Sequence, residues 1–344
     1  METLSRDRWS LARANAERAE ALAVFGFTDR QARFLVQVLL HAGVFVERQY
    51  CQFAGIAHGQ KTSDFLARLV ERRYATAVFT GPLHRGRLFH VHYTPLWTAI
   101  GEPDSRYRKP AALGRLIERV MLLDAVLSDS SHVWLGPSRD KLRHFADAFG
   151  DRLRQDELPR LTFGAGPAKT VRYFPDKLPV GIQPYAPPHV LLYLVTSPSP
   201  ADFRAFLLRH TTLLGALREW TIRLLVPTPL ARMAPRFEQA AREHLATRLS
   251  PSSADELSWF FRERQRLAAS PAERGDRRFG DDAKAFAGPR FAAIYRAWLA
   301  EGDPVIWAAR SVVVPDAVER GEGHLETVRL SRQYLHLSPL VGLA

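Results

Sequence analysis

The fold of the N-terminal third is decided by residues 27–78, which read FTDRQARFLVQVLLHAGVFVERQYCQFAGIAHGQKTSDFLARLVERRYATAV. Thr28 stands three residues before Gln31, the spacing of a capping box, and an apolar-periodic stretch from Arg33 to Leu40 follows it. Gly43 stands where a helix is expected to end in the left-handed conformation. This opening therefore predicts one helix, bounded by the capping box and by the glycine.

Two further helices and a hairpin are predicted downstream. The third helix keeps its apolar residues at i, i+3 and i+4, and the second strand alternates from residue to residue. The predicted elements are helices over 47–56 and 62–73, strands over 74–80 and 87–93, and a basic turn over 81–86. Three helices followed by a hairpin with a basic turn are typical of a winged helix-turn-helix.

The remaining two thirds of the chain predict a different architecture. A polar, proline-bounded segment over 102–110 is expected to be a linker, and the periodic helix over 113–127 is a candidate dimer element. Strand-like and helical stretches then follow one another, over 171–174, 190–195, 201–220, 222–226 and 231–249. Beyond Pro251 the pattern is helical.

The predicted fold class is therefore α+β, with a winged helix-turn-helix followed by a small α/β domain and a mostly helical C-terminal region. The expected units are an N-terminal arm or helix over 1–24, the winged helix over 25–101, a linker with helices over 102–158, the α/β domain over 159–250 and the helical region over 251–344.

The charge balance favours a polyanionic partner. Lys and Arg number 48 against 36 Asp and Glu, a formal net charge of +12, and basic side chains that neutralise phosphates release condensed counterions. An Arg-rich genome composition would give the same balance. A single cysteine, Cys51, excludes an internal disulfide. The charged N-terminus and the lack of a long apolar run predict a cytoplasmic protein with no membrane contact.

A helix that enters the major groove needs polar and basic residues on its outer face. Gln60 and Lys61 are candidates for base edges, whereas Arg68 and Arg72 lie four residues apart and suit phosphates. Basic residues of the turn would meet phosphates or the minor groove. The predicted DNA-binding residues are Gln60, Lys61, Thr62, Ser63, Arg68, Arg72, Arg73, His84, Arg85 and Arg87.

Signatures of catalysis are absent from the sequence. No phosphate-binding Walker loop, dinucleotide fingerprint, nucleophile elbow or zinc-protease motif occurs. His90 and His92 share one face of a strand, a spacing that can hold a metal, but two histidines without a third ligand are more typical of half-buried strand residues. We therefore predict no catalytic residue, no metal and no cofactor.

Residues 27–78 and the following RLFHVHYTPLW over 87–97 resemble the opening of the replication-relaxation-like proteins of bacterial plasmids and integrated elements. The resemblance rests on the order of the helices, the short strand and the strand that ends in Thr-Pro. It implies DNA binding in transcriptional control or in the maintenance of a mobile element.

The second domain resembles a decayed restriction-endonuclease-like core, through YFPDK at 173–177 and the stretches that follow it. Active members place an Asp after Pro and then Glu-x-Lys or Asp-x-Lys on the next strand, so that carboxylates hold a metal. Asp176 matches the first position, but the next strand, HVLLYLVT at 189–196, has neither an acid nor a Lys. The resemblance thus implies a scaffold for DNA or protein contacts.

The sequence as a whole predicts a sequence-specific regulator or maintenance factor that binds duplex DNA as a homodimer, with protein contacts through its C-terminal domains. One alternative is a metal-dependent DNA-processing nuclease built on Asp176 with other acids such as Asp156 and Glu157. The other is a winged helix that serves only as a protein-interaction module in a larger assembly.

Overall fold

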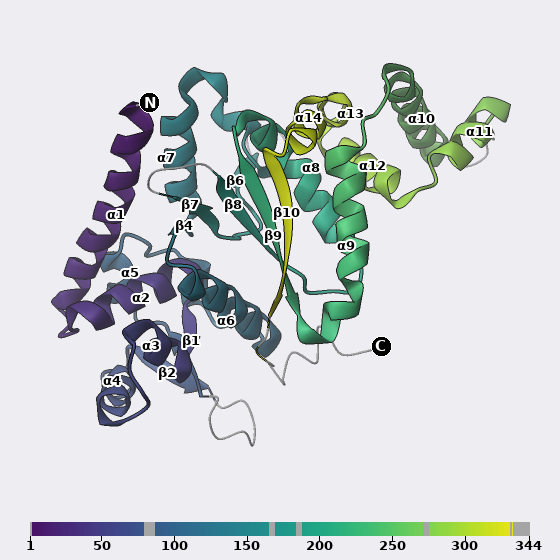
Figure 1. Cartoon of the computed structure of the whole chain (residues 1–344). Coiled ribbons are helices and arrows are strands. Elements are labelled where there is room, and N and C mark those ends of the chain that lie inside the picture. Colours follow the sequence, from purple (N-terminus) through teal and green to yellow (C-terminus); the bar gives the residue numbers. More distant parts are fainter. Residues whose placement is uncertain are drawn as a thin grey trace.

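The computed structural model describes residues 2–78, 87–164, 169–183, 188–270, 275–330 and 332, with side chains from Leu11 onward except that of Pro251. The long helix α1 (Glu2–Ala23) packs against the N-terminal unit, which we define as residues 25–101 (Figure 1). This unit contains α2 (Asp29–His41), β1 (Val44–Val46), α3 (Glu47–Ala54), α4 (Gln60–Glu71), β2 (Ala75–Val78), β3 (Leu88–Val91) and α5 (Thr94–Ala99).

The first predicted helix has the expected boundaries. The Thr28 side chain accepts from the Gln31 backbone N–H, and the Gln31 side chain accepts from the Thr28 backbone N–H, which completes the capping box. Gly43 follows the helix at φ +69°, and a Cβ there would lie 2.6 Å from the carbonyl oxygen of Tyr107. Glycine is therefore required at this position by both conformation and space.

The strands of the N-terminal unit form an antiparallel sheet in the order β1-β3-β2. The strand β1 was not predicted, because its three residues carry too short a pattern. Aromatic side chains fill the space between this sheet and the helices. The ring of Phe34 packs edge-on against those of Phe45 and Tyr50, and the rings of Tyr50 and Phe65 lie 4.4 Å apart.

A five-stranded mixed sheet forms the centre of the chain, in the order β10-β9-β8-β7-β4. The strands β8, β9 and β10 run parallel, whereas β7 and β4 are antiparallel to their neighbours. Its elements and the connecting helices are α6 (Leu113–Ser128), β4 (Val133–Leu135), α7 (Ser138–Phe149), β7 (Val180–Ile182), β8 (His189–Leu194), α8 (Ala201–Ala216), β9 (Trp220–Pro227), α9 (Ala234–Ala241) and β10 (Gly323–Leu330).

Helices cover both faces of this sheet. Along β8, Val190 and Leu192 pack with α6, whereas Leu191 between them belongs to the core that α7, α8 and α9 form on the other face. The alternation follows from the two-residue period of a strand and explains why the whole strand is apolar.

The helix α6 joins the N-terminal unit to the sheet. Figure 1 shows α6 lying between the N-terminal unit and the central sheet. Leu116 and Val120 pack in the core of the N-terminal unit, whereas Ile117 and Met121 pack against the sheet. The sequence predicts this helix as a candidate dimer element. Its apolar residues pack against the N-terminal unit and the central sheet, and the dimer itself stays a prediction.

Several predicted boundaries also change. The strand β4 lies in the predicted linker region and β10 in the predicted helical region, yet both belong to the central sheet. The stretch over 171–174 pairs instead in a separate hairpin of β5 (Arg160–Phe163) and β6 (Thr170–Tyr173).

The predicted long helix over 231–249 is broken, because a 3-10 segment precedes α9 and a π-helical segment follows it. The 3-10 segment before α9 is η5 (Thr228–Met233), and the π-helical segment after it is η6 (Arg242–Ala246). Further 3-10 segments are η1 (Arg106–Arg108), η2 (Gly150–Arg152) and η3 (Gln155–Glu157).

The C-terminal helices have a small core of their own, in which Leu257, Phe261 and Ile294 are buried. They are α10 (Pro251–Ala269), α11 (Arg277–Ala285), α12 (Pro289–Glu301), α13 (Pro304–Arg310) and α14 (Val313–Glu319). The helix α12 packs against α8 and so attaches this group to the central sheet. Within the described part of the chain, no helix is both long enough and apolar enough to cross a membrane.

Candidate nucleic-acid interface

The helices α3 and α4 are connected by a turn that begins at Gly55, which ends α3 in the left-handed conformation at φ +63°. The apolar face of α4 then anchors the helix, because Phe65 and Leu69 are completely buried in the core of the N-terminal unit. The opposite face of α4 is exposed. The local sequence thus presents one side of α4 to solvent beside the β2–β3 hairpin.

An open groove of about 960 Å³ lies between α4 and this hairpin. On the helix side it is lined by Ser63, Ala67 and Val70, which lie one turn apart on the exposed face of α4. On the strand side it is lined by small residues of β2, including Thr76. Small side chains on both walls leave room for an elongated partner to approach the backbone.

Arg73 lines the groove with an unusual backbone. Its φ is +55°, a conformation that favours glycine and disfavours any residue with a Cβ. The backbone N–H of Arg73 donates to Val70 and that of Tyr74 to Leu69, so the end of α4 is a Schellman motif with Arg in the usual glycine position. Retention of a long cationic side chain in a strained position is typical of a functional site.

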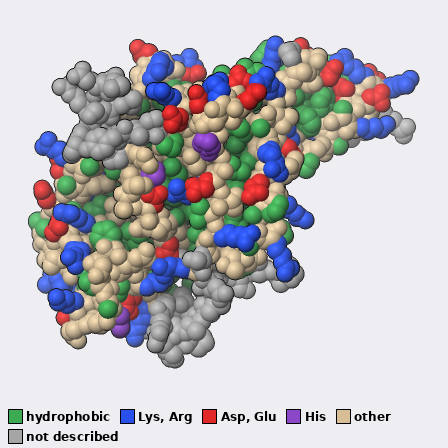
Figure 2. Space-filling model, viewed as in Figure 1, with side chains coloured by type: hydrophobic (Ala, Val, Ile, Leu, Met, Phe, Trp, Pro, Cys, Tyr) green, Lys and Arg blue, Asp and Glu red, His purple; other side chains and the backbone are tan. Residues whose placement is uncertain are grey.

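The charge of the groove is mixed. Arg73 and Arg87 are exposed at its rim, and Glu71 and Glu47 also line it. The Glu47 carboxylate contacts the ring nitrogen Nδ1 of His58. Figure 2 shows Lys and Arg side chains distributed over the visible face rather than gathered into one patch. Total charge alone therefore does not locate an interface, and the shape of the groove is the more specific feature.

The residues predicted at the start of α4 have different environments. Gln60 and Lys61 are exposed, and the Gln60 side-chain amide donates to Asp64 at 2.6 Å. Ser63 is exposed in the groove. Thr62 was wrongly predicted as a DNA contact: its side chain is completely buried, and its hydroxyl lies 3.6 Å from the sulfur of Cys51 in α3. Thr62 therefore packs the two helices together.

The two arginines predicted to bind phosphates have partners within the chain. Arg68 Nη1 donates to the carbonyl of Gly26 at 2.7 Å, and Arg72 Nη1 donates to that of Phe25 at 3.2 Å. Both carbonyls belong to the connection between α1 and α2, so these side chains hold α4 against it. Both guanidinium groups remain near the surface, and their hydrogen bonds hold α4 in position.

Two further predicted residues, His84 and Arg85, lie outside the described residues. Ala67, Val70 and Thr76 line the groove but were not predicted, because they carry neither the base-reading nor the phosphate-binding chemistry of a DNA contact. The signal was nevertheless present, since Ser63, Ala67 and Val70 recur at i, i+4 and i+7 beside the apolar stripe.

His90 lies in β3, and His92 follows the end of this strand. His90 is buried and its Nε2 lies 2.9 Å from the carbonyl oxygen of Tyr107, whereas His92 lines the groove. Burial is the main cause that lowers the pKa of His90. His90 thus packs the N-terminal unit against the segment that follows it.

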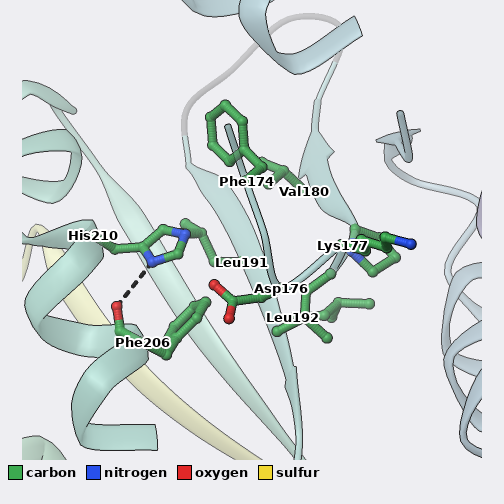
Figure 3. Close-up of a pocket in the computed structure, with 10 residues that line it drawn as sticks. Phe174, Asp176, Lys177, Val180, Leu191, Leu192, Phe206 and His210 are labelled. Atoms are coloured by element: carbon green, nitrogen blue, oxygen red, sulfur yellow. Dashed lines mark hydrogen bonds between the residues drawn. The ribbon is translucent and has the colours of Figure 1, made fainter. Parts of the chain in front are cut away.

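The residues of the nuclease alternative are engaged elsewhere. Arg209 Nη1 lies 2.8 and 2.7 Å from the two carboxylate oxygens of Asp176. Asp156 and Glu157 instead contact Arg154. Figure 3 shows the side chains of Asp176 and Lys177 pointing in opposite directions. Among the described residues, no group of three or more His, Cys, Asp or Glu is placed to hold a metal ion.

Two buried titratable groups lie near Asp176. Burial lowers the pKa of Lys141 to about 7, and its side-chain nitrogen donates to the carbonyl of Leu178. Burial also lowers the pKa of His210 to about 4, and its Nδ1 lies 2.9 Å from the carbonyl oxygen of Phe206 (Figure 3). Lys141 thus binds α7 to the segment before β7, whereas the contact of His210 lies within α8.

The chain matches no protein-family model, and no significant similarity to a curated protein or to a solved structure was found. The geometry of the chain is thus the basis of any functional assignment. Within it, the groove between α4 and the β2–β3 hairpin combines an open shape with the exposed side chains of Arg73 and Arg87.

Proposed function

We propose that the N-terminal unit is a winged helix that binds duplex DNA, with α4 as the recognition helix and the β2–β3 hairpin as the wing. The observation that carries this proposal is the groove between α4 and the hairpin, which Ser63, Arg73 and Arg87 line with exposed side chains. The major groove of B-DNA admits an α-helix, and a neighbouring wing meets the adjacent backbone.

In this proposal the exposed residues of α4 and of the groove divide into two kinds. Lys61, Arg73 and Arg87 neutralise phosphates, while Gln60 and Ser63 contact base edges from the exposed start of α4. Ala67 lets the helix approach the bases closely, because its methyl group adds little bulk. Arg68 and Arg72 act indirectly, since their bonds to the α1–α2 connection fix the position of α4.

The rest of the chain serves in this proposal as a scaffold for self-association or partner contacts. The ion pair between Asp176 and Arg209 and the sequence of β8, which carries no acidic side chain, disfavour the nuclease alternative. A homodimer would place two recognition helices on paired half-sites. The biological role that we propose is transcriptional control or maintenance of a mobile element inside the bacterial cell, which rests on the resemblance of residues 27–97 to the replication-relaxation-like proteins.

The test is to bind the purified full chain to a pool of randomised DNA duplexes, raise the salt concentration and sequence the bound fraction. We expect an enriched sequence with two related half-sites, and an affinity that falls linearly with salt on logarithmic axes. Failure to bind any duplex at low salt would reject the proposal and would favour the protein-interaction alternative.

A further inference from the structure

A second groove, of about 520 Å³, lies where the parallel strands of the central sheet end. The strands β8 and β9 run parallel, and each leads at its carboxyl end towards a helix, α8 or α9. Parallel strands end at the same edge of a sheet, and crevices outside that edge are the usual place for ligands in open α/β sheets. The groove is lined by Ser199, Pro200, Ala201, Arg204, Pro235, Arg236, Gln239, Pro289, Ala292 and Arg296.

Two helices begin at this groove. Ala201 is the first residue of α8 and Pro289 is the first residue of α12, whereas α9 continues from η5 and passes the groove at Pro235. The first turn of a helix carries backbone N–H groups without partners in the helix, and the aligned peptide dipoles add about half a positive charge there. Two such ends on one groove favour an anion.

The side chains of the groove add to this positive potential. Arg204, Arg236 and Arg296 line it, whereas no Asp or Glu does. Asp202, the acidic residue in the first turn of α8, is not among the lining residues. Arg236 and Arg296 are exposed and can move towards a ligand, whereas Arg204 is fixed at the base.

Arg204 is the buried member of the set. Its exposed fraction is 5%, its Nη1 lies 2.5 Å from Oε2 of Glu243, and its Nε has no hydrogen-bond partner among the described residues. Arg290 is also buried, and its pKa is lowered by burial, raised by Glu243 and lowered by Arg204. The Glu243 carboxylate pairs with Arg204, whereas Arg290 Nη2 donates to the carbonyl of Thr247. A buried cation that keeps an N–H without a partner is unfavourable, which favours an anion beside Arg204.

We propose that this groove binds the phosphate group of a small phosphomonoester. The phosphate would lie over the starts of α8 and α12, within reach of the guanidinium groups of Arg204, Arg236 and Arg296, which match its oxygens in geometry. The apolar walls, formed by the proline and alanine side chains, suit the organic part of such a molecule. The volume lies within the range of small-molecule sites. This site is separate from the proposed DNA interface and does not depend on it.

The experiment is calorimetric titration of the full chain with adenosine 5′-monophosphate, inorganic phosphate and adenosine. We expect the monophosphate and phosphate to bind and adenosine not to bind. Arg236→Ala and Arg296→Ala should each weaken the binding about tenfold, the loss of one charge-assisted contact. Arg232→Ala is the matched control, because Arg232 is exposed but does not line the groove. Arg204 is left intact, because its removal would leave Glu243 without its ion-pair partner.

Two outcomes would overturn the proposal. One is the absence of any phosphate or monophosphate binding at millimolar concentration, or binding that both arginine variants leave unchanged. The other arises in a parallel titration with a DNA duplex: if only duplex binding depends on Arg236 and Arg296, the phosphate belongs to DNA rather than to a small molecule. The duplex affinity of the Ala67 variant described below tests the DNA interface independently.

Discussion

Arg48 and Asp124 join the N-terminal unit to α6 through a two-point ion pair, with Nη1–Oδ1 at 2.6 Å and Nη2–Oδ2 at 2.5 Å. Gln49 adds bonds from its amide to the carbonyl of Val120 and to Asp124, both at 2.9 Å. Because the other side of α6 packs on the central sheet, these bonds fix α3 and α4 relative to the α/β region. The proposed recognition helix is thus held by a rigid support.

Asp124→Ala should therefore destabilise the junction. It removes a largely buried carboxylate and leaves Gln49 without one of its acceptors, so we expect the free energy of unfolding in urea to fall by about 2 kcal/mol. Asp29→Ala is the control, since its ion pair with Arg33 lies at the surface and contributes at most about 0.5 kcal/mol. Equal losses in the two variants would show that the Arg48–Asp124 pair adds nothing beyond a surface contact.

Arg73→Gly should change the free energy of unfolding and the affinity for duplex DNA in opposite directions. Glycine relieves the left-handed backbone, so the free energy of unfolding should rise by about 1 kcal/mol. The same change should weaken duplex binding, because the guanidinium in the groove is lost. Arg73→Ala is the matched control: it should weaken binding equally without the gain in stability. Unchanged affinity in both variants would remove Arg73 from the interface.

His41 should make the fold sensitive to acid. Burial, assisted by Lys141 and Arg18, lowers its pKa to about 3, and neither ring nitrogen has a hydrogen-bond partner among the described residues. The folded chain therefore keeps His41 neutral, whereas the unfolded chain protonates it below its ordinary pKa of about 6.5. The contribution of neutral His41 to the free energy of unfolding is complete above pH 6.5 and is lost as the pH falls towards 3.

His41→Leu should accordingly flatten the loss of stability between pH 6.5 and pH 4, measured by urea unfolding at several pH values. His324→Gln, a change at an exposed histidine, should leave that slope as in the wild type. A His41 variant with the wild-type slope would show that other groups cause the acid sensitivity.

Alanine substitutions of Lys61 and of Arg68 should affect different properties, although both side chains are cationic and belong to α4. Lys61→Ala should lower the salt dependence of duplex binding by about one unit of slope, as the loss of a phosphate contact does, with little change in stability. Arg68→Ala should lower the free energy of unfolding by about 1 kcal/mol, because the bond to Gly26 is lost. If Arg68→Ala instead reduced the slope by a full unit, Arg68 would itself contact a phosphate.

The sequence predicted those parts of the fold that depend on local chemistry. The capping box at Thr28 and the left-handed glycine at Gly43 are local features, and α2 has the boundaries that they indicate. The strand β10 could not be found in this way, because its partner β9 lies about a hundred residues earlier and its charged residues resemble a surface segment. Pairing between distant strands is set by the assembled sheet rather than by local preference.

The candidate site was predicted only in part, for a related reason. Thr62 lies three and seven residues before Phe65 and Leu69, so the helical period places it on the buried face even though its side chain is polar. Arg68 and Arg72 have the right chemistry for phosphates, but their partners lie more than 40 residues earlier in the chain. Residue type alone does not reveal such long-range bonds.

The most direct test of the proposed DNA interface is the duplex affinity of Ala67→Glu, compared with that of Ala268→Glu. Both alanines are exposed on helices, but only Ala67 lines the groove beside the hairpin. A carboxylate in the groove should repel the phosphates and weaken binding at least about tenfold, which corresponds to 1.4 kcal/mol, whereas the same change at Ala268 should leave the affinity close to that of the wild type. Equal affinities for the two variants, with both folded, would contradict the assignment of α4 and its groove as the DNA-binding surface.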